Sequence, residues 1–410
     1  MPETPPPGAE PLDPVPAPRV LLAGGGTAGH VNPLLATAAA LREPALGGRR
    51  EAGILVLGTA EGLEADLVPE AGFDMAVVPR VPMPRRPTGD LFMLPRRLSR
   101  AVGAAAEAIE ALDAQVVVGF GGYVSTPAYL AARRAGVPVV IHEQNARPGL
   151  ANRLGASWAA AVALTFASTP LRSSKGRTEV TGLPLRPAIG ELVARLAEPD
   201  GAAAARRSGA AALGLDPRAP TVLITGGSLG AQRLNEVLAA ALPSLSPDLQ
   251  VLHLTGRDKD GPVRAAVEAA VADGAAADLA ERYHVLDYLV AMEQAYACAD
   301  GVICRSGAGT VAELTALGLP ALYVPLPIGN GEQRLNAADV VAAGGGRLVA
   351  DARLTAADVV DFTALLTRPA ERGAMAAAAA STGVRDGARR LADLIRTVAR
   401  EGSPSPRRKA

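Results

Sequence analysis

The residues best suited to chemistry lie in a glycine-rich stretch near the amino terminus. An apolar run at residues 20–23 leads into the segment 24–30 (Gly-Gly-Gly-Thr-Ala-Gly-His), and a helical pattern follows over residues 34–41. A strand, a glycine loop and a helix in this order present backbone N–H groups and a helix N-terminus to an anion. At the end of the loop, the imidazole of His30 could accept a hydroxyl proton near neutral pH. The alternative is a polar group at a helix start that bonds only to nearby backbone.

The spacing of Gly24, Gly26 and Gly29 also matches the dinucleotide-binding fingerprint. That fingerprint expects an acidic residue at the end of the next strand, about 20 residues further on. The next apolar run ends at Leu57-Gly58-Thr59, and Glu61 lies further away than the rule requires. The sequence therefore favours a phosphate or a sugar over NAD or FAD at this loop. Tight packing of the strand against the helix is the alternative use of the glycines.

Two further polar segments follow predicted strands of the first half. Residues 119–125 (Gly-Phe-Gly-Gly-Tyr-Val-Ser) form a second glycine turn, at the carboxyl end of a strand, where ligands bind in α/β proteins. Residues 142–145 (His-Glu-Gln-Asn) end the following strand. Four polar groups are costly to bury without partners, so we expect them to line an open cleft. The alternative is a loop network of internal hydrogen bonds.

The second half contains three comparable segments. Residues 226–232 again follow a strand and open a helix, so their amides and the Ser228 hydroxyl should hold phosphate. Residues 305–313 follow another strand, and Glu313 lies about one turn into the next helix. A carboxylate there could accept two hydrogen bonds from a ribose diol, or it could simply complement the helix dipole. Gln333 and Asn336 share one face of a helix start, and their amides suit sugar hydroxyls.

One metal-like pattern occurs outside these segments. Asp258 and Asp260 spell the Asp-x-Asp pattern that binds a metal and a nucleotide in some glycosyltransferases. They lie in a charged turn, so we expect no metal there.

The composition of the 410-residue chain favours two α/β domains in a reducing compartment. Aromatic residues make up only 3% of the chain, which suits helices packed on sheets. The 41 basic and 41 acidic residues cancel, so no bulk field attracts nucleic acid. We interpret Cys298 and Cys304 as core residues, because their spacing matches no redox or zinc motif. We expect no signal peptide, and no apolar run reaches the roughly 18 residues of a membrane-spanning helix.

Apolar runs alternate with helical patterns in two successive halves of the chain, as expected for doubly wound parallel sheets. The predicted strands are residues 20–23, 53–58, 74–78, 115–119, 137–142 and 161–164, then 221–225, 250–255, 284–286, 301–304 and 320–324. We predict an α/β protein of GT-B architecture, with two Rossmann-like domains that face each other across a cleft. The predicted divisions are a disordered proline-rich tail (1–18), an amino-terminal Rossmann-like domain (19–185), a carboxyl-terminal Rossmann-like domain (186–384), a helix that packs back on the first domain (385–401) and a disordered tail (402–410).

Taken together, these loops resemble the MurG family, bacterial N-acetylglucosaminyltransferases that convert lipid I to lipid II. The similarity covers about residues 19–400. The motifs that carry it are 25–30, 121–123, 142–145, 182–186, 226–231, 306–313 and 333–336. The sequence departs from the family pattern in three segments. Residues 182–186 read Gly-Leu-Pro-Leu-Arg in place of Gly-Asn-Pro-Val-Arg, Ala28 replaces a loop glycine, and Glu332 stands where some relatives carry glutamine.

The resemblance implies specific roles for residues at the two sets of loops. His30 would be the catalytic base. The residues implied in binding UDP-N-acetylglucosamine are Thr27, Ala28, Gly29, Asn145, Arg186, Ser228, Leu289, Ala308, Gly309, Thr310, Val311, Ala312, Glu313, Gln333 and Asn336. Among these, Ser228 would hold the diphosphate, Glu313 the ribose, and Arg186 and the backbone near Leu289 the uracil. The implied acceptor loops contain Gly25, Gly26, Gly121, Gly122 and Tyr123.

The resemblance also implies the partners and the place of action. The acceptor, lipid I, is undecaprenyl-linked, so the chain would be peripheral on the cytoplasmic side of the cell membrane, near other proteins of cell-wall synthesis and division. Residues 80–86 and 91–97 mix basic and apolar side chains, as in monotopic docking on anionic lipid, although an ordinary helix with core leucines is the alternative. No cofactor is implied, and a divalent cation would be at most helpful. The other functions that fit the layout are a different GT-B transferase, a UDP-N-acetylglucosamine 2-epimerase and a non-catalytic binding module.

Overall fold

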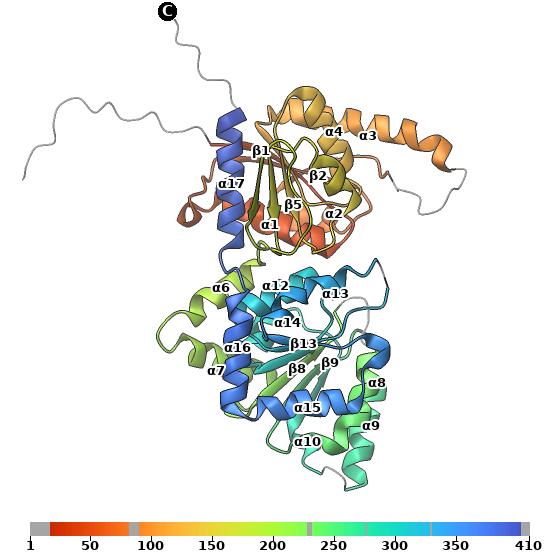
Figure 1. The fold of residues 1–410 in the computed structure, drawn as a ribbon, viewed down its shortest axis with the longest axis vertical. Coiled ribbons are helices and arrows are strands. Elements are labelled where there is room, and N and C mark those ends of the chain that lie inside the picture. Colours follow the sequence, from red (N-terminus) through yellow and green to blue (C-terminus); the bar gives the residue numbers. More distant parts are fainter. Residues whose placement is uncertain (1–16, 82–89, 228–231, 275–276, 329, 403–410) are drawn as a thin grey trace, which may run out of the picture.

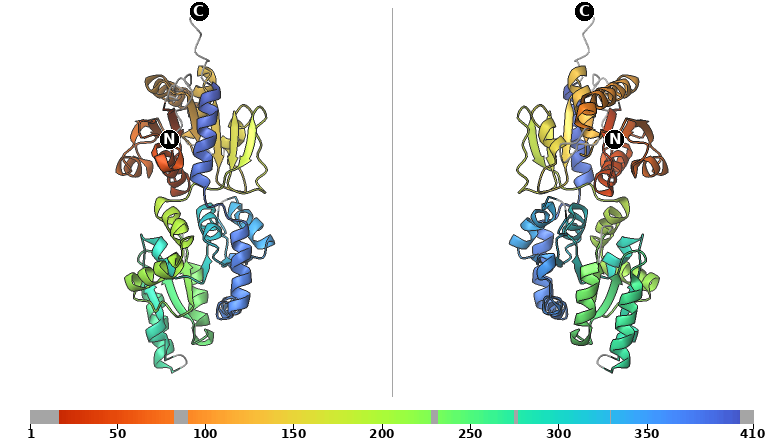
Figure 2. Two further views of the ribbon diagram at one scale, coloured as in Figure 1. Left: turned by 90° about the vertical axis from the view of Figure 1, so that its left-hand side faces the viewer. Right: turned by 90° about the vertical axis from the view of Figure 1, so that its right-hand side faces the viewer.

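The computed structural model describes residues 17–81, 90–227, 232–274, 277–328 and 330–402. Two α/β units lie one above the other, and the side views show the same stacking (Figures 1 and 2). Helix α1 (Ala28–Arg42) of the upper unit and helices α12 (Ala308–Leu317) and α13 (Glu332–Asn336) of the lower unit lie at their junction.

The amino-terminal unit is built on a parallel sheet of seven strands in the order β3-β2-β1-β4-β5-β6-β7. Its strands are β1 (Arg19–Ala23), β2 (Gly53–Gly58), β3 (Asp74–Val77), β4 (Val116–Gly119), β5 (Val139–Glu143), β6 (Ala161–Leu164) and β7 (Arg177–Val180). Beside α1, its helices are α2 (Glu64–Glu70), α3 (Asp90–Leu112), α4 (Ser125–Ala135) and α5 (Leu150–Gly155), with a short 3-10 turn at Pro44–Leu46. The strand order places β1 near the centre of the sheet, so the loop that follows β1 opens at the middle of the carboxyl edge.

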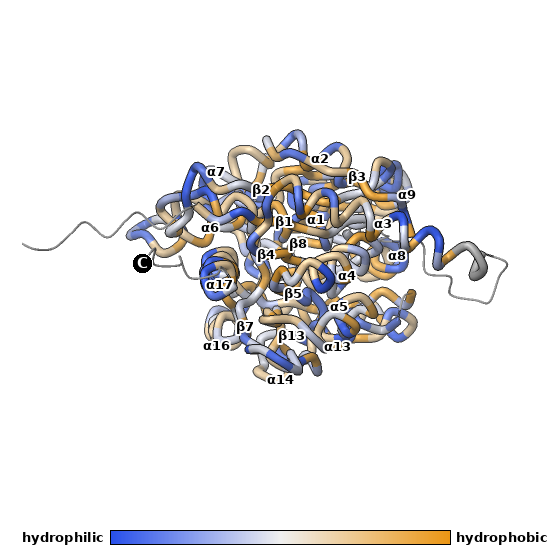
Figure 3. Tube along the Cα trace, turned by 90° about the horizontal axis from the view of Figure 1, so that it is seen from above, coloured by the Kyte–Doolittle hydropathy of each residue, from blue (hydrophilic) through white to orange (hydrophobic). Residues whose placement is uncertain are grey.

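Both faces of this sheet are buried. Val20 and Leu22 of β1 belong to a core cluster with α1 and α17 (Gly387–Gly402). Leu21 and Ala23 point the other way, into a cluster with α3 and α4. Successive strand residues face opposite sides of a sheet, and here both sides are apolar. In the view from above, hydrophobic segments, drawn in orange, gather around the labels of the central strands of this unit (Figure 3).

The carboxyl-terminal unit repeats this design with six parallel strands in the order β10-β9-β8-β11-β12-β13. Its strands are β8 (Thr221–Thr225), β9 (Gln250–Leu254), β10 (Tyr283–Leu286), β11 (Gly301–Cys304), β12 (Ala321–Tyr323) and β13 (Gly346–Leu348). Beside α12 and α13, its helices are α6 (Pro187–Leu196), α7 (Gly201–Leu213), α8 (Gln232–Ala241), α9 (Asp260–Ala272), α10 (Leu279–Arg282), α11 (Met292–Cys298), α14 (Ala338–Ala342), α15 (Ala356–Leu366) and α16 (Pro369–Ser381). Short 3-10 turns occur at Leu242–Ser244 and Asp351–Arg353. The α/β class and the two Rossmann-like sheets predicted from the sequence are thus confirmed.

The last helix crosses from the second unit to the first. Helix α17 packs on α1 and β4, and its buried stripe consists of Leu391, Leu394, Ile395 and Val398. Gly387 lets the chain make this crossing, because a Cβ there would lie 2.5 Å from the Leu183 carbonyl oxygen. The amino-terminal sheet is therefore completed by the end of the chain.

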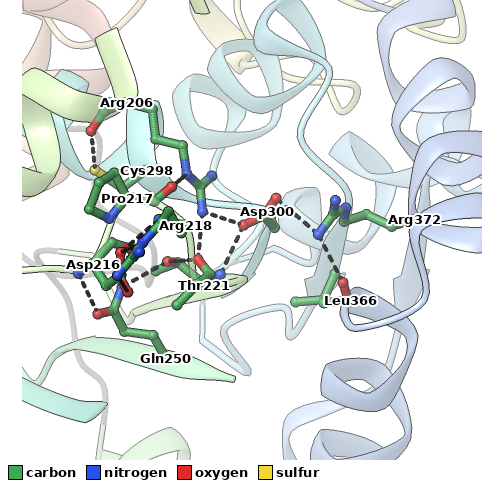
Figure 4. A network of polar contacts seen from close by, with 11 residues as sticks. Arg206, Asp216, Pro217, Arg218, Thr221, Gln250, Cys298, Asp300, Leu366 and Arg372 are labelled. Carbon is green, nitrogen blue, oxygen red and sulfur yellow. Dashed lines mark hydrogen bonds and ion pairs between the residues drawn. The ribbon is translucent and has the colours of Figure 1, made fainter. Parts of the chain in front are cut away.

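A half-buried carboxylate just before β11, that of Asp300, ties the second sheet to its helices (Figure 4). Asp300 accepts hydrogen bonds from Thr221 N at 2.9 Å and from the Arg206 guanidinium at 2.8 Å, and it forms an ion pair with Arg372 at 3.1 Å. These partners come from β8, α7 and α16. Cys298 lies beside this network, and both it and Cys304 are buried free thiols, as the sequence indicated.

Candidate active site

The loop between β1 and α1 combines tight packing with an exposed tip. Gly26 has φ +84°, and a Cβ at Gly25 would lie 2.3 Å from Glu64 Oε1. Thr27, Ala28 and Gly29 are exposed, and the Thr27 carbonyl accepts hydrogen bonds from the amides of the first helical turn. The first half of the loop is thus fixed against the protein. Its second half, with the N-terminus of α1, is open to a ligand.

His30 is half-buried and has a defined tautomer. Its Nδ1 lies 3.2 Å from the Gly25 carbonyl oxygen and 3.1 Å from Thr27 Oγ1. A carbonyl oxygen only accepts, so Nδ1 carries the proton and Nε2 the lone pair in the neutral ring. Burial lowers the pKa of His30, and the Gly25 hydrogen bond and the Glu64 charge oppose that effect. The neutral imidazole therefore prevails at neutral pH, as a general base requires.

The second glycine turn packs directly on this imidazole. Gly121 and Gly122 have φ of +92° and +79°. A Cβ at Gly121 would lie 3.1 Å from His30 Nε2, and one at Gly122 would lie 2.7 Å from the Gly25 carbonyl oxygen. Tyr123 is 38% exposed. The structure thus brings the two predicted acceptor loops together around His30.

The expectation of an open cleft at residues 142–145 is wrong for three of the four side chains. His142, Glu143 and Gln144 are 0%, 2% and 2% exposed. Glu143 accepts hydrogen bonds from Asn145 N, Gly149 N and Asn152 Nδ2, and His142 donates to the Gly182 carbonyl at 3.0 Å. This is the internal network that the sequence left as the alternative, because backbone amides from the next loop supply the missing partners.

Asn145 and Asn336 meet at the junction of the two units. Asn336 Nδ2 donates to Asn145 Oδ1 at 3.3 Å and to the Ser306 carbonyl, and its Oδ1 accepts from Ala146 N at 2.8 Å. Asn336 is 1% exposed. Its role as a sugar contact stays a prediction, and the structure gives its amide a different set of partners.

Arg186 and Glu313 form a bidentate ion pair. Arg186 Nε lies 2.8 Å from Glu313 Oε1 and its terminal nitrogen lies 3.2 Å from Oε2. Tyr296 donates to the same Oε2 at 3.1 Å. Burial, and then the Glu313 charge, raise the pKa of Tyr296, so its hydroxyl stays a donor. The two residues predicted to hold uracil and ribose are therefore preassembled beside each other.

The remaining predicted donor-side residues differ in their exposure and contacts. Ala308, Gly309 and Thr310 are partly exposed at the N-terminus of α12. Val311 and Ala312 are buried, at 1% and 8% exposure. Leu289 is half-buried against the core, and Gln333 Oε1 accepts from Leu326 N at 2.9 Å. Ser228 lies outside the described residues. In the Asp-x-Asp segment, Asp260 is paired with Arg264 at 2.8 Å.

Glu64 is a residue of this site that the sequence analysis missed. It is fully buried at the start of α2, and its carboxylate contacts the glycine loop. No local pattern in the sequence marks Glu64, because it lies 38 positions after Gly26 and meets the loop only in the fold.

Comparison with known proteins decides the family. The models of the glycosyltransferase family 28 N-terminal and C-terminal domains match residues 20–164 and 221–391. A protein of Bifidobacterium longum (strain DJO10A) is 52% identical over 347 residues, covering 82% of this chain and 86% of its own length. One of Clavibacter michiganensis subsp. michiganensis is 50% identical, covering 95% and 99%. Both are named UDP-N-acetylglucosamine–N-acetylmuramyl-(pentapeptide) pyrophosphoryl-undecaprenol N-acetylglucosamine transferase. The chain belongs to this transferase family.

Solved structures agree with this assignment. The crystal structure of Acinetobacter baumannii MurG aligns with a TM-score of 0.73 and 28% identity, covering 93% of this chain and 99% of that one. The UDP-GlcNAc 2-epimerase of Neisseria meningitidis aligns with a TM-score of 0.62 at 16% identity, covering 93% and 99%. At that identity the second similarity shows the GT-B fold alone.

Proposed function

We propose that the chain transfers N-acetylglucosamine from UDP-N-acetylglucosamine to the C4 hydroxyl of the N-acetylmuramic acid of undecaprenyl-pyrophosphoryl-MurNAc-pentapeptide, forming lipid II. The observation that carries this proposal is the 50% identity, over 95% of the chain, to a transferase named for this reaction. The clustering of the two acceptor-side loops around His30 supports it.

The donor would bind to the carboxyl-terminal unit. In the Arg186–Glu313 pair, Arg186 caps the start of α6 and Glu313 lies in the second turn of α12, where a nucleoside could meet a charged and hydrogen-bonding surface. The free N–H groups at the start of α12 could hold diphosphate, together with the loop of Ser228. Gln333 and Asn145 would address the sugar.

The proposed reaction inverts the anomeric centre. His30 Nε2 removes the proton from the acceptor hydroxyl as its oxygen forms a bond to C1 of the donor sugar. The bond from C1 to the UDP oxygen breaks, and its electron pair leaves with UDP. Helix N-termini would stabilise the charge on the departing diphosphate. We propose that no cofactor takes part and that a divalent cation is not obligatory.

A lipid-linked acceptor requires contact with the membrane surface. Within the described residues, no helix is both long and apolar enough to cross a membrane. Helix α3 projects from the amino-terminal unit and carries exposed Arg96 and Arg100 (Figure 1). We propose peripheral docking of this region on the cytoplasmic face, where each basic group near anionic lipid contributes about 1 kcal/mol. Residues 82–89 of the predicted docking segment lie outside the described residues. Contacts with other proteins of cell-wall synthesis and division are a further expectation.

The assignment is tested by incubating the protein with UDP-N-acetylglucosamine, with and without a lipid I analogue. We expect release of UDP only when the acceptor is present, with formation of the disaccharide lipid. Isomerisation of the donor without acceptor would support the epimerase alternative, and binding without turnover would support a binding module. Either result would overturn the proposal.

A further inference from the structure

The carboxylate of Glu64 is buried directly beneath the β1–α1 loop. The residue is 0% exposed. Oε2 accepts a hydrogen bond from Gly26 N at 2.9 Å, and Oε1 accepts from Thr59 N at 3.0 Å and from Thr59 Oγ1 at 2.7 Å. Burial acts to raise the pKa of Glu64, but these hydrogen bonds outweigh it and hold the pKa below its ordinary value. The group is therefore an ionised carboxylate at neutral pH.

Three glycines make room for this carboxylate. A Cβ at Gly25 would lie 2.3 Å from Oε1, one at Gly62 would lie 2.2 Å from Oε2, and one at Gly58 would lie 2.7 Å from Cγ. No side chain fits at these distances. The loop after β1 and the turn after β2 thus close around the Glu64 side chain and fix its position.

A single peptide group joins Glu64 to His30. The N–H of the peptide between Gly25 and Gly26 donates to Glu64 at 2.9 Å. The carbonyl of the same peptide accepts from His30 Nδ1 at 3.2 Å. A hydrogen bond at one end of an amide polarises the amide and strengthens the bond at the other end. The negative charge of Glu64 therefore strengthens the hydrogen bond between the Gly25 carbonyl and His30 Nδ1, and it does so through a single peptide group.

We propose that Glu64 is a positioning residue for the catalytic base, acting on His30 through the Gly25–Gly26 peptide. This inference rests on the proposed role of His30 as the base. The relay holds the proton on Nδ1, so that the Nε2 lone pair is available on the side of the second glycine turn. It also stabilises the imidazolium that forms when Nε2 takes the acceptor proton, as a carboxylate does when it bonds directly to a catalytic histidine.

The groups on the other elements around the imidazole are as follows. The β4–α4 loop places Gly121 and Gly122 against the ring, and the guanidinium of Arg80 lies 5.5 Å from the ring centroid of the following Tyr123. On its own helix, His30 contacts the hydroxyl of Thr27. Among the described residues, Glu64 is the charged group that shifts the pKa of His30, and it shifts it upward.

The tautomer and the pKa of His30 can be measured without substrate by NMR on 15N-histidine-labelled protein. The chain has four histidines, and burial lowers the pKa of His142 to about 4 and of His253 to about 3. The signals missing from a His30→Gln variant assign His30. In the wild type we expect the neutral ring to be protonated at Nδ1. In Glu64→Gln we expect the pKa of His30 to fall, because the charge that raises it is gone.

Glu70→Gln is the matched control, since it removes an exposed carboxylate from the same helix and should leave His30 unchanged. An Nε2-protonated ring in the wild type would overturn the proposal, and that measurement needs no variant to fold. An unchanged pKa of His30 in folded Glu64→Gln would overturn it as well.

Kinetics separate the relay from the base assignment. We expect Glu64→Gln to lower kcat about tenfold, with the KM for UDP-N-acetylglucosamine changed less than about twofold, because the loss concerns proton transfer. A lower pKa leaves His30 neutral at more acidic pH, so the acidic limb of the kcat profile should move to lower pH. Glu64→Asp should restore part of kcat. Near-wild-type turnover by His30→Ala would refute the base assignment while leaving the NMR result intact. An inactive His30→Ala with an unchanged pKa in Glu64→Gln would refute the relay alone.

Discussion

The imidazole of His30 is held by residues that lie far apart in the sequence. Gly25 fixes Nδ1 from one loop, and Gly121 approaches Nε2 from another loop, 96 positions later. Both loops follow adjacent strands, β1 and β4. Glycine is therefore required here for space as well as for backbone conformation, since the second turn can approach the ring only without a Cβ.

Replacing Gly121 by alanine should abolish most of the activity for this reason. The new Cβ would lie 3.1 Å from Nε2 and at φ +92°, and we expect a stability loss of about 1–2 kcal/mol from the backbone strain alone. Gly136→Ala is the control, because Gly136 has φ +70° and its new methyl group would meet no heavy atom within 4 Å. Both variants should lose stability in urea denaturation, and only Gly121→Ala should lose kcat. Equal activities would contradict a contact between this turn and the base.

Whether the sequence could predict the setting of a residue depends on how close its partners lie in the chain. Gly24 to His30 could be identified because strand, turn and helix signals are local. The burial of His142, Glu143 and Gln144 could not be predicted. Nothing in the sequence shows that the backbone amides of residues 145 and 149 donate hydrogen bonds to Glu143. The bidentate pairing of Arg186 with Glu313 bridges 127 positions and depends on the fold.

The final helix, α17, packs on the amino-terminal unit, although it lies at the other end of the chain. Helix α17 covers β4 and packs on α1. Its apolar stripe was visible in the sequence, because Leu391, Leu394, Ile395 and Val398 recur at helical spacing. The stripe alone does not say which sheet it covers. The structure shows that it belongs to the core cluster of β1 and β2.

Ile395→Ala should therefore destabilise the amino-terminal unit. Ile395 is 0% exposed in that core, and such a truncation costs about 2–5 kcal/mol. The one tryptophan of the chain is Trp158, which packs against the other face of the same sheet, so its fluorescence follows unfolding of this unit. Arg400→Ala, at an exposed position of the same helix, should leave the midpoint in guanidinium chloride nearly unchanged. A wild-type midpoint for Ile395→Ala would mean that α17 does not stabilise the sheet.

The strands that the sequence missed share a position at a sheet edge. β7 (Arg-Thr-Glu-Val) is mostly exposed, and β13 has three residues. The predicted strands were recognised as apolar runs, which arise where both faces of a parallel sheet are covered. An edge strand that is short or polar lacks this signal. The predicted strands agree with the structure to within one residue at each end, except for β5, whose predicted start lies two residues too early.

At the scale of the whole molecule, the two units are joined by specific polar contacts at the candidate site. Asn336 bridges to Ala146 and Asn145, Ser168 N donates to Asp339 at 3.3 Å, and Arg147 donates to the Asn330 carbonyl. These contacts come from the loops after β5 and β6 and from the region of α13 and α14. A motion of one unit against the other would have to break them, and any such motion would change the distance between the donor side and His30.

The bridge at Asn336 gives a direct test of whether this side chain serves the contact between units or the donor sugar. Asn336→Ala would leave the Ala146 N–H without its partner at 2.8 Å, and loss of a buried hydrogen bond costs about 1–3 kcal/mol. We expect the Ala146 amide to exchange with deuterium roughly 10- to 100-fold faster in the ligand-free variant. Glu332→Gln on the same helix is the control, because its carboxylate accepts from Asn330 N within its own loop. If Asn336 instead serves only the sugar, the variant will keep wild-type exchange at Ala146 and show a raised KM for UDP-N-acetylglucosamine.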